Sequence, residues 1–239
     1  MKFSTIASCL IGMLICALTA AAQNPPHDDH QLWDDVQITK ALAPNRDLVL
    51  SGQLRIGQEF QSTVEEQIGA ALAFKLNSHL TLAPAYSFIA QQPYPGRRVN
   101  QHRIVFAATG KFTWRNFTFT DRNQFERRFV LANPDSTVYR QRLTIDHPVH
   151  IGAFKFRAFI WDEVRYSSLN LAAGGRLGWY RNRLALGVSK QLNEQLTVDV
   201  FYLRQNDGVS RPGNIHAVGL TLRVFLKAAS KPPKMEKSG

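Results

Sequence analysis

The chain has 239 residues, of which 44% are hydrophobic and 20% charged, and its formal net charge is +11. Apart from one apolar run at the start, apolar residues alternate with polar ones. The mean hydropathy of -0.21 therefore averages over alternating positions and does not reveal the pattern. The two cysteines, Cys9 and Cys16, both lie in that first run. The rest of the chain therefore offers no thiol for a disulfide, a metal site or a cysteine nucleophile.

The first 22 residues have the pattern of a secretory signal peptide. Lys2 supplies the positive start, Ile6–Leu18 the apolar stretch, and Ala20–Ala22 the small residues of a cleavage site. A retained transmembrane helix would need roughly 20 apolar residues and a stop-transfer flank. Neither cysteine has the context of a lipidation site. Residues 1–22 are thus predicted to be removed, which takes away Lys2 and lowers the net charge to +10.

A basic chain often binds nucleic acid, but an exported chain rarely meets it, and the basic residues here are scattered at alternate positions. We expect outer-membrane lipid, lipopolysaccharide or anionic solutes as counterparts, and no nucleic acid. Arginine outnumbers lysine, which suits hydrogen-bonded networks inside a barrel. Because no glycine-rich phosphate loop, zinc spacing or calcium loop occurs, the sequence predicts no cofactor.

Residues 23–46 form a polar lead-in that contains a candidate first strand. His27 and His30 lie near two aspartates, where a metal site competes with the simpler interpretation of a solvated terminus. The candidate strand, Leu32–Leu42, ends at the turn signal Pro44–Arg46.

From Leu48 to Leu226 the chain alternates apolar and polar residues in segments of about ten, the length of a tilted membrane strand. The clearest unit is the hairpin Arg183–Gln205, in which every second residue of both arms is apolar. A period of two with one apolar face indicates strands that are polar on one side only. The residues predicted to face lipid are Leu184, Leu186, Val188, Leu196, Val198, Val200, Leu220, Leu222 and Val224.

The predicted connections alternate between long and short, as in outer-membrane barrels. Long loops are expected after Phe88, Phe129, Tyr166 and Gln205, and short turns after Leu76, Phe112, Pro148 and Leu192. Two of the expected loops are Gln91–Asn100 and Glu59–Glu66, and one expected turn is His147–Gly152. A soluble β-sandwich has no reason to sort its loops in this way.

Aromatic residues near strand ends match the interfacial girdles of a barrel, and the strands must close because lipid cannot pair a free edge. These aromatics are Trp33, Phe60, Tyr86, Trp114, Tyr139, Trp179 and Tyr202. The sequence predicts an all-β, antiparallel transmembrane β-barrel over residues 47–226, with about ten strands and twelve as the alternative. Counting Leu32–Leu42 gives eleven, which is awkward for a bacterial barrel. Residues 227–239 are predicted to be a basic, disordered tail.

Several motifs resemble the bacterial family catalogued as domain of unknown function 2490, which is grouped with outer-membrane barrels. They are Trp33, Gln53-Leu54-Arg55, Asp121–Arg128, Tyr139–Leu143 and Trp161–Val164. The resemblance covers nearly all of the chain after the leader, implies the outer membrane of a Gram-negative bacterium, and carries no activity to transfer. Gly219, Leu222 and Val224 also resemble the signal read by the barrel-assembly machinery, except that residues 227–239 follow it.

The most specific polar pattern is a set of charged residues predicted to face the lumen. Arg122, Glu126 and Arg128 share one parity and should lie beside Arg140 and Arg142 on the next strand. The predicted network comprises Arg55, Arg103, Arg122, Glu126, Arg128, Arg140, Arg142, Asp146, Glu163, Arg183 and Asp199. Unpaired charge in a lumen is costly, so the arginines should pair with the carboxylates. Two interpretations remain open: a salt-bridged structural plug, or a narrow anion-preferring pore or binding barrel.

A lipid-modifying enzyme, either an acyl hydrolase or an acyl transferase, is the alternative from another class. It would need a hydroxyl nucleophile beside a base. His102 and His216 lie at strand beginnings, near Ser87, Ser167, Ser168 and Ser210, but no nucleophile motif surrounds these serines. The sequence therefore favours a barrel without catalysis, and it leaves open the ligand, the open or closed state of the lumen and the oligomeric state.

Overall fold

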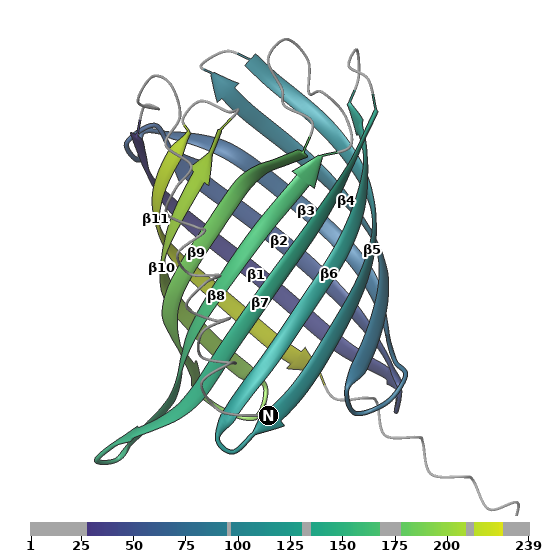
Figure 1. Cartoon of the computed structure of the whole chain (residues 1–239), viewed down its shortest axis with the longest axis vertical. Helices are drawn as coiled ribbons and strands as arrows, with labels where there is room; N and C mark the ends of the chain where they lie inside the picture. The colour runs from purple at the N-terminus through teal and green to yellow at the C-terminus, as the bar shows by residue number, and fades with distance from the viewer. Residues whose placement is uncertain (1–27, 95–96, 131–134, 168–177, 209–212, 227–239) are drawn as a thin grey trace, which may run out of the picture.

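In the computed structural model, the described residues (28–94, 97–130, 135–167, 178–208 and 213–226) form a closed β-barrel (Figure 1). Its strands are β1 (Asp28–Ala43), β2 (Arg46–Gly57), β3 (Ser62–Lys75), β4 (Leu80–Tyr94), β5 (Arg97–Trp114), β6 (Phe117–Val130), β7 (Ser136–Ile151), β8 (Phe154–Ser167), β9 (Gly178–Gln191), β10 (Leu196–Asp207) and β11 (Asn214–Leu226). The predicted signal peptide and the predicted tail lie outside the described residues.

The barrel is closed by a parallel pair of strands. From β1 to β11 each strand pairs with the next in antiparallel fashion, and β1 then pairs with β11 in parallel, from Asp28↔Asn214 to Lys40↔Leu226. Because strands alternate in direction, an odd number leaves the first and last pointing the same way, so they can only pair in parallel. The predicted all-β barrel is confirmed, and the described residues contain eleven strands. We call the β1–β11 pair the seam.

The candidate strand Leu32–Leu42 lies within β1, so the barrel begins at Asp28 and not at residue 47. β1 is held on both sides, by β11 across the seam and by β2. Its Asp29 also accepts hydrogen bonds from the backbone N–H groups of Gln58 (3.2 Å) and Glu59 (2.9 Å). Gln58, Glu59 and Phe60 all have positive φ, so Asp29 fastens a strained connection between β2 and β3.

The strand ends differ from three predictions. Instead of a loop at Gln91–Asn100, β4 and β5 leave only residues 95–96 between them, and β3 begins at Ser62 within the predicted loop Glu59–Glu66. β7 runs to Ile151 through the predicted turn His147–Gly152. The backbone ladder pairs N–H with C=O whatever the side chain is, so strands continue into polar sequence. The stretches 131–134, 168–177 and 209–212 lie outside the described residues.

The two ends of the barrel are named here by their connections. At the turn end, residues 44–45, 76–79, 115–116, 152–153 and 192–195 join the strands. The opposite end, where β6, β8 and β10 finish, is the loop end (upper end in Figure 1).

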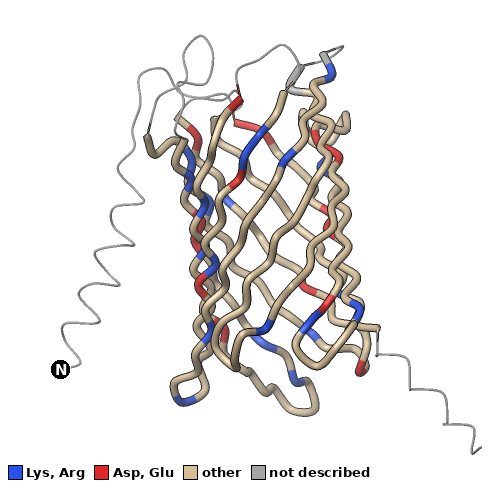
Figure 2. Tube along the Cα trace, turned by 90° about the vertical axis from the view of Figure 1, so that its right-hand side faces the viewer, with Lys and Arg blue, Asp and Glu red and all other residues tan. Residues whose placement is uncertain are grey.

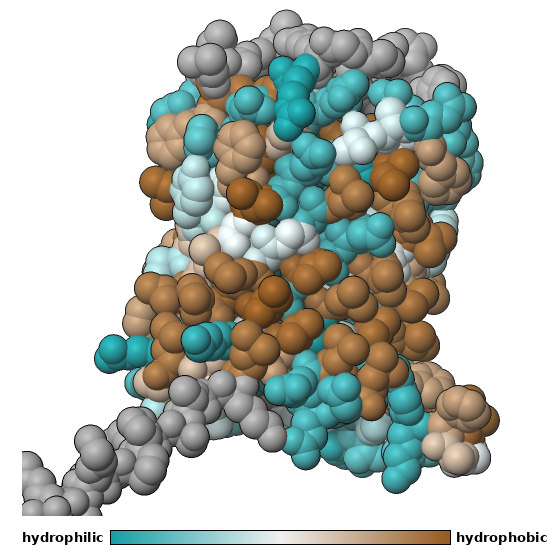
Figure 3. Space-filling view, turned by 180° about the vertical axis from the view of Figure 1, so that it is seen from behind, coloured by the Kyte–Doolittle hydropathy of each residue, from teal (hydrophilic) through white to brown (hydrophobic). Residues whose placement is uncertain are grey.

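The outer surface carries an apolar belt. Leu186, Val188 and Val200 are 58%, 43% and 47% exposed, whereas the alternate residues Ala185 and Phe201 are buried. Seen from behind in Figure 3, apolar side chains cover much of the middle and lower surface, and hydrophilic ones dominate the upper part. The described residues contain no helix that is long and apolar enough to cross a membrane.

An apolar cluster also lies inside the barrel. It comprises Trp33, Trp161, Ala185, Phe201, Leu203, Ile215 and Ala217. Trp33 is 4% exposed, so its assignment to the interfacial girdle was wrong, because β1 turns its odd-numbered residues inward. The Phe201 ring packs over Gly219, where an added Cβ would come within 2.0 Å of the ring. Only glycine allows this approach.

Candidate functional site: the charged lumen

The structure places all eleven predicted network residues on the inner face of the barrel. Ten of them line a cavity of about 900 Å³. The eleventh, Glu163, is 1% exposed and bonds to several of the lining arginines. In a side view, charged positions recur along the strands over the length of the barrel (Figure 2).

Glu163 on β8 is a centre of the network. Its carboxylate accepts hydrogen bonds from Arg140 Nη2 (2.7 Å) and Arg142 Nη2 (2.7 Å) on β7. It also accepts from Arg165 Nε (3.0 Å) on its own strand, and Arg183 Nη1 on β9 lies 3.4 Å away. One buried carboxylate thus receives four guanidinium groups from three strands.

Glu126 on β6 is the second centre and is also 1% exposed. Arg128 Nη2 and Arg140 Nη1 each lie 2.6 Å from its carboxylate, and Arg103 Nη1 lies 3.6 Å away. Arg140 therefore bridges Glu126 and Glu163 across β7. Charge-assisted bonds of this kind fix the geometry of a network as well as its energy.

Further ion pairs extend the network to residues that the sequence argument missed. They are Arg55–Glu65, Arg157–Asp146, Arg181–Asp207 and Arg223–Asp199. The predicted network contained one residue of three of these pairs, namely Arg55, Asp146 and Asp199. It contained neither residue of the pair Arg181–Asp207. The alternation of inward and outward residues along each strand could have identified some of them. Arg165 follows Glu163 by two residues and Arg181 precedes Arg183 by two, so each shares the inward face of its neighbour.

Aromatic rings contact some of the arginines. The Trp33 ring contacts two guanidiniums, with Arg55 Cζ 4.0 Å and Arg183 Cζ 4.7 Å from its centroid. Arg142 Cζ lies 4.2 Å from the Trp161 centroid. The negative faces of the indoles attract these cations and so stabilise an arginine-rich interior.

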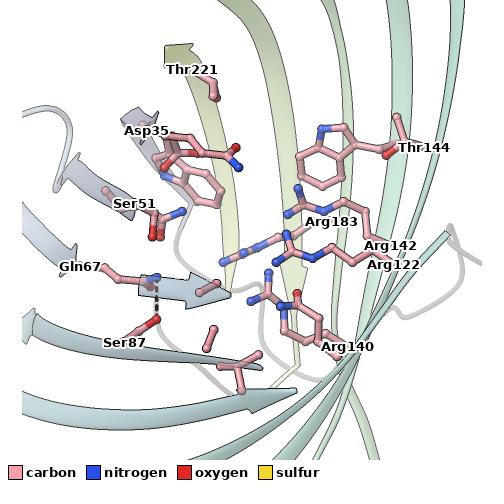
Figure 4. A pocket seen from close by; sticks show the side chains of 18 of the residues that line it. Asp35, Ser51, Gln67, Ser87, Arg122, Arg140, Arg142, Thr144, Arg183 and Thr221 are labelled. Carbon is pink, nitrogen blue, oxygen red and sulfur yellow. Dashed lines mark hydrogen bonds between the residues drawn. The ribbon is translucent and has the colours of Figure 1, made fainter. Parts of the chain in front are cut away.

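The cavity has a strong excess of positive charge. Its lining includes twelve arginine or lysine residues against five aspartate or glutamate residues, and the buried Glu163 and Asp207, which pair with five of these arginines, add two carboxylates to its wall. Arg122, Arg140, Arg142 and Arg183 approach it from one side, and Asp35, Ser51, Gln67 and Ser87 from the other (Figure 4). Among the described residues, no carboxylate forms an ion pair with Arg122, whose side chain is exposed to the cavity.

Burial of the inward side chains differs between the two halves of the barrel. In the loop-end half they fill the lumen, as shown by Glu126, Glu163, Arg183 and Gln205, which are 1–2% exposed. In the turn-end half several inward side chains are small and half-buried, such as Thr120, Thr144, Ser189 and Thr221, although the ion pairs Arg157–Asp146 and Arg223–Asp199 also lie there. The lumen is thus more densely filled towards the loop end than towards the turn end. We call the turn-end half the cup.

The histidines and serines that could serve an enzyme lie on opposite faces of the wall. His102 and His216 point outward, each with Nδ1 2.6 Å from a tyrosine hydroxyl, on Tyr86 and Tyr202 respectively. Ser87 lines the cavity on the inner face, so it cannot meet His102. Ser168 and Ser210 lie outside the described residues.

Of the two histidines considered for a metal in the lead-in, His30 pairs with Glu59 (2.9 Å) and His27 lies outside the described residues. Within the described ranges, no cluster of three or more histidine, cysteine, aspartate or glutamate residues could hold a metal ion.

Comparisons with known proteins bear on the family alone. The family model described as "Protein of unknown function (DUF2490)" matches residues 30–215. An uncharacterised protein of Methylorubrum extorquens is 24% identical over 226 residues, which cover 91% of this chain and 96% of that protein.

Two solved structures share a limited likeness. The siderophore receptor PirA from Pseudomonas aeruginosa aligns with a TM-score of 0.35 and 13% identity, covering 78% of this chain and 40% of the receptor. This chain therefore spans less than half of the receptor's length. The KdgM porin aligns with a TM-score of 0.39 and 12% identity, covering 74% of this chain and 90% of the porin.

Proposed function

The chain belongs to the DUF2490 family of proteins of unknown function, and from its geometry we propose that it is an outer-membrane barrel that binds an anionic solute in the cup. Closed barrels with an apolar outer belt are one of the two architectures that satisfy every backbone group within lipid. By the usual rule for such barrels, the short turns lie in the periplasm. The cup then opens towards the periplasm.

The observation that carries this proposal is the charge of the cavity. The whole cavity lining holds twelve cationic and five anionic side chains, most of them paired, and Arg122 lies exposed at the inner limit of the cup without an ion pair among the described residues. A low-dielectric wall focuses this field and concentrates anions. Arginine also presents several N–H donors in a fixed fork that matches carboxylate and phosphate groups. A small solute with several negative charges fits this arrangement.

The filled half of the lumen favours binding over passage. Glu126 and Glu163 hold arginines from β5 to β9 in the loop-end half, and the side chains there are buried. A steady ion path would have to break these buried pairs, each costly to separate. We therefore place binding first and the narrow anion-preferring pore second.

Thermal unfolding in detergent micelles tests the proposal, because a ligand that binds only the folded state stabilises it in proportion to its saturation. Citrate and pyrophosphate should raise the Tm more than sodium chloride of equal ionic strength, and spermidine should not. Arg122→Gln should remove most of that increase. The matched control is Arg127→Gln, which removes an exposed outer-face arginine paired with Asp135. In planar bilayers the unmodified protein should show no steady conductance.

Two results would contradict the proposal in different ways. Steady anion-selective conductance that Arg122→Gln diminishes would establish the pore instead. A Tm that responds to citrate no more than to sodium chloride would leave a purely structural barrel.

A further inference from the structure

A polar cluster interrupts the apolar belt on the outer face of β6–β9, which lie side by side at the front of Figure 1. Its members are Asp121, Asn123, Tyr139, Gln141, Asp162 and Asn182, here called the outer polar patch. For Asp121, Asn123 and Asn182, the residues immediately before and after line the cavity. Side chains alternate across a strand, so these three point away from the lumen. The same alternation places Gln141 outward between Arg140 and Arg142.

Apolar residues lie on both sides of the patch along the strands. On β6, Phe119 precedes Asp121 and Phe125, 56% exposed, follows Asn123. On β9, Leu186, 58% exposed, lies towards the turn end, and Trp179, 64% exposed, lies towards the loop end. The patch therefore lies between exposed apolar side chains, with Tyr139 and Trp179, predicted above as girdle residues, on its loop-end side.

The patch is only partly satisfied by its own hydrogen bonds. Asp121 accepts from Asn123 Nδ2 (2.8 Å) and Gln141 Nε2 (3.2 Å), and Asn123 Oδ1 accepts from the Tyr139 hydroxyl. Asn182 Nδ2 donates to Asp162 Oδ1 (2.8 Å). Asn182 Nδ2 also donates to the Glu163 backbone carbonyl (3.5 Å). Within the described residues, the amide nitrogens of Asn123 and Gln141 each keep one hydrogen without a partner, and the side-chain oxygens of Gln141 and Asn182 accept no hydrogen bond. Lipid chains offer no partner for these groups.

We propose that the outer polar patch is the contact between two copies of this chain in the membrane. Within the described residues Gln141 keeps both a free donor and a free acceptor, Asn123 a free donor and Asn182 a free acceptor. The surface is therefore complementary to itself, as a twofold interface requires. A second copy inserted in the same orientation also presents its patch at the same depth, whereas a soluble protein cannot reach it. Polar side chains that pair within a bilayer are an established way of joining membrane segments.

This inference rests on the proposed membrane location but not on the proposed ligand of the cup. A failed citrate experiment would leave it untouched. A failed dimer experiment would likewise leave the cup unaffected.

Cysteine cross-linking in intact outer membranes tests the dimer, because the only natural cysteines, Cys9 and Cys16, lie in the predicted leader. Leu143 pairs with Asp121 on one side and with Asp162 on the other, so it marks the centre of the patch. Leu143→Cys should give a dimer band with a short bismaleimide. The matched control is Leu50→Cys on β2, which is 44% exposed on the opposite wall and should stay monomeric.

A second variant separates a specific contact from crowding. Asn123→Leu combined with Gln141→Leu makes the patch apolar, so it should reduce the Leu143→Cys dimer several-fold while heat-modifiable migration on a gel still reports a folded barrel. If that combination does not fold, Gln141→Leu alone should reduce the dimer. The proposal is overturned if Leu143→Cys and Leu50→Cys cross-link equally, if the apolar variants leave the dimer unchanged, or if the product is a complex with another protein.

Discussion

At the scale of single residues, Glu163 is the carboxylate on which four arginines converge. It is 1% exposed and lies within ion-pair distance of Arg140, Arg142, Arg165 and Arg183. Its negative charge offsets the repulsion among these guanidiniums, which no neutral side chain could do. Arg140 also binds Glu126, so the two central carboxylates share one arginine.

Glu163→Gln should therefore destabilise the folded barrel strongly. Glutamine keeps the shape but removes the charge, and uncompensated buried charge costs about 3–5 kcal/mol. Urea unfolding in micelles, followed by tryptophan fluorescence, measures the change. Glu66→Gln is the matched control, since Glu66 pairs with Arg98 at 3.1 Å on the exposed surface, where such pairs contribute about 0–1 kcal/mol. Similar losses for both variants would refute the central role of Glu163.

At the scale of the strands, β9 and β10 approach closely because glycine occupies one position. A Cβ at Gly187 would come within 2.5 Å of the Val200 carbonyl oxygen and 2.6 Å of Phe201 Cβ. Both are on β10 and neither can rotate away, so the strand spacing depends on the missing side chain.

Gly187→Ala should accordingly lower the stability by about 1–3 kcal/mol, the usual cost of overpacking. The control is Gly52→Ala on β2, where an added Cβ would meet no atom within 4 Å. Denaturant midpoints of the two variants, measured side by side in the same detergent, decide the matter. A destabilised Gly52→Ala variant would show instead that any alanine in the wall is harmful.

The outward face of β11 supplies a test of the membrane placement. Leu222→Arg should assemble poorly, because arginine facing the middle of the bilayer costs about 2–4 kcal/mol, against about 0–1 near the interfaces. Leu226→Arg, at the end of the same strand, should assemble almost normally. The fraction of protein with heat-modifiable migration in isolated outer membranes measures assembly. Equal behaviour of the two variants would argue against a belt buried in lipid.

At the scale of the whole molecule, the sequence predicted the faces of the strands better than their ends or their number. A period of two assigns each side chain to a face, so the inward position of Arg122, Glu126 and Arg140 followed from the pattern. β1 was harder to recognise, because its outward face includes Asp34 and Lys40 and so breaks the alternation. The number of strands depends on how the sheet closes into a barrel, and no local sequence pattern reports this.

The pairing of the lumen charges was only partly predictable for a related reason. Arg140 contacts Glu126 on β6 and Glu163 on β8, and these contacts depend on the registers of two separate strand pairs. The register of a strand pair changes with every residue added to the connection between the strands, and the sequence-based prediction placed several connections wrongly. The inward position of Trp33 was missed because β1 was not assigned to the wall.

The parallel seam has a consequence for engineering the topology of the chain. In an even-stranded barrel the first strand starts at the same end of the barrel at which the last strand finishes. A short peptide can therefore join the two termini, and the chain can be opened at another connection. Here Asp28 and Leu226 lie at opposite ends of a seam of thirteen paired positions, roughly 40 Å apart at about 3.3 Å per residue. A joining peptide would have to pass through lipid or through the filled lumen. A short peptide therefore cannot join the termini of this barrel for circular permutation. Tags placed before β1 and after β11 would report from opposite sides of the membrane.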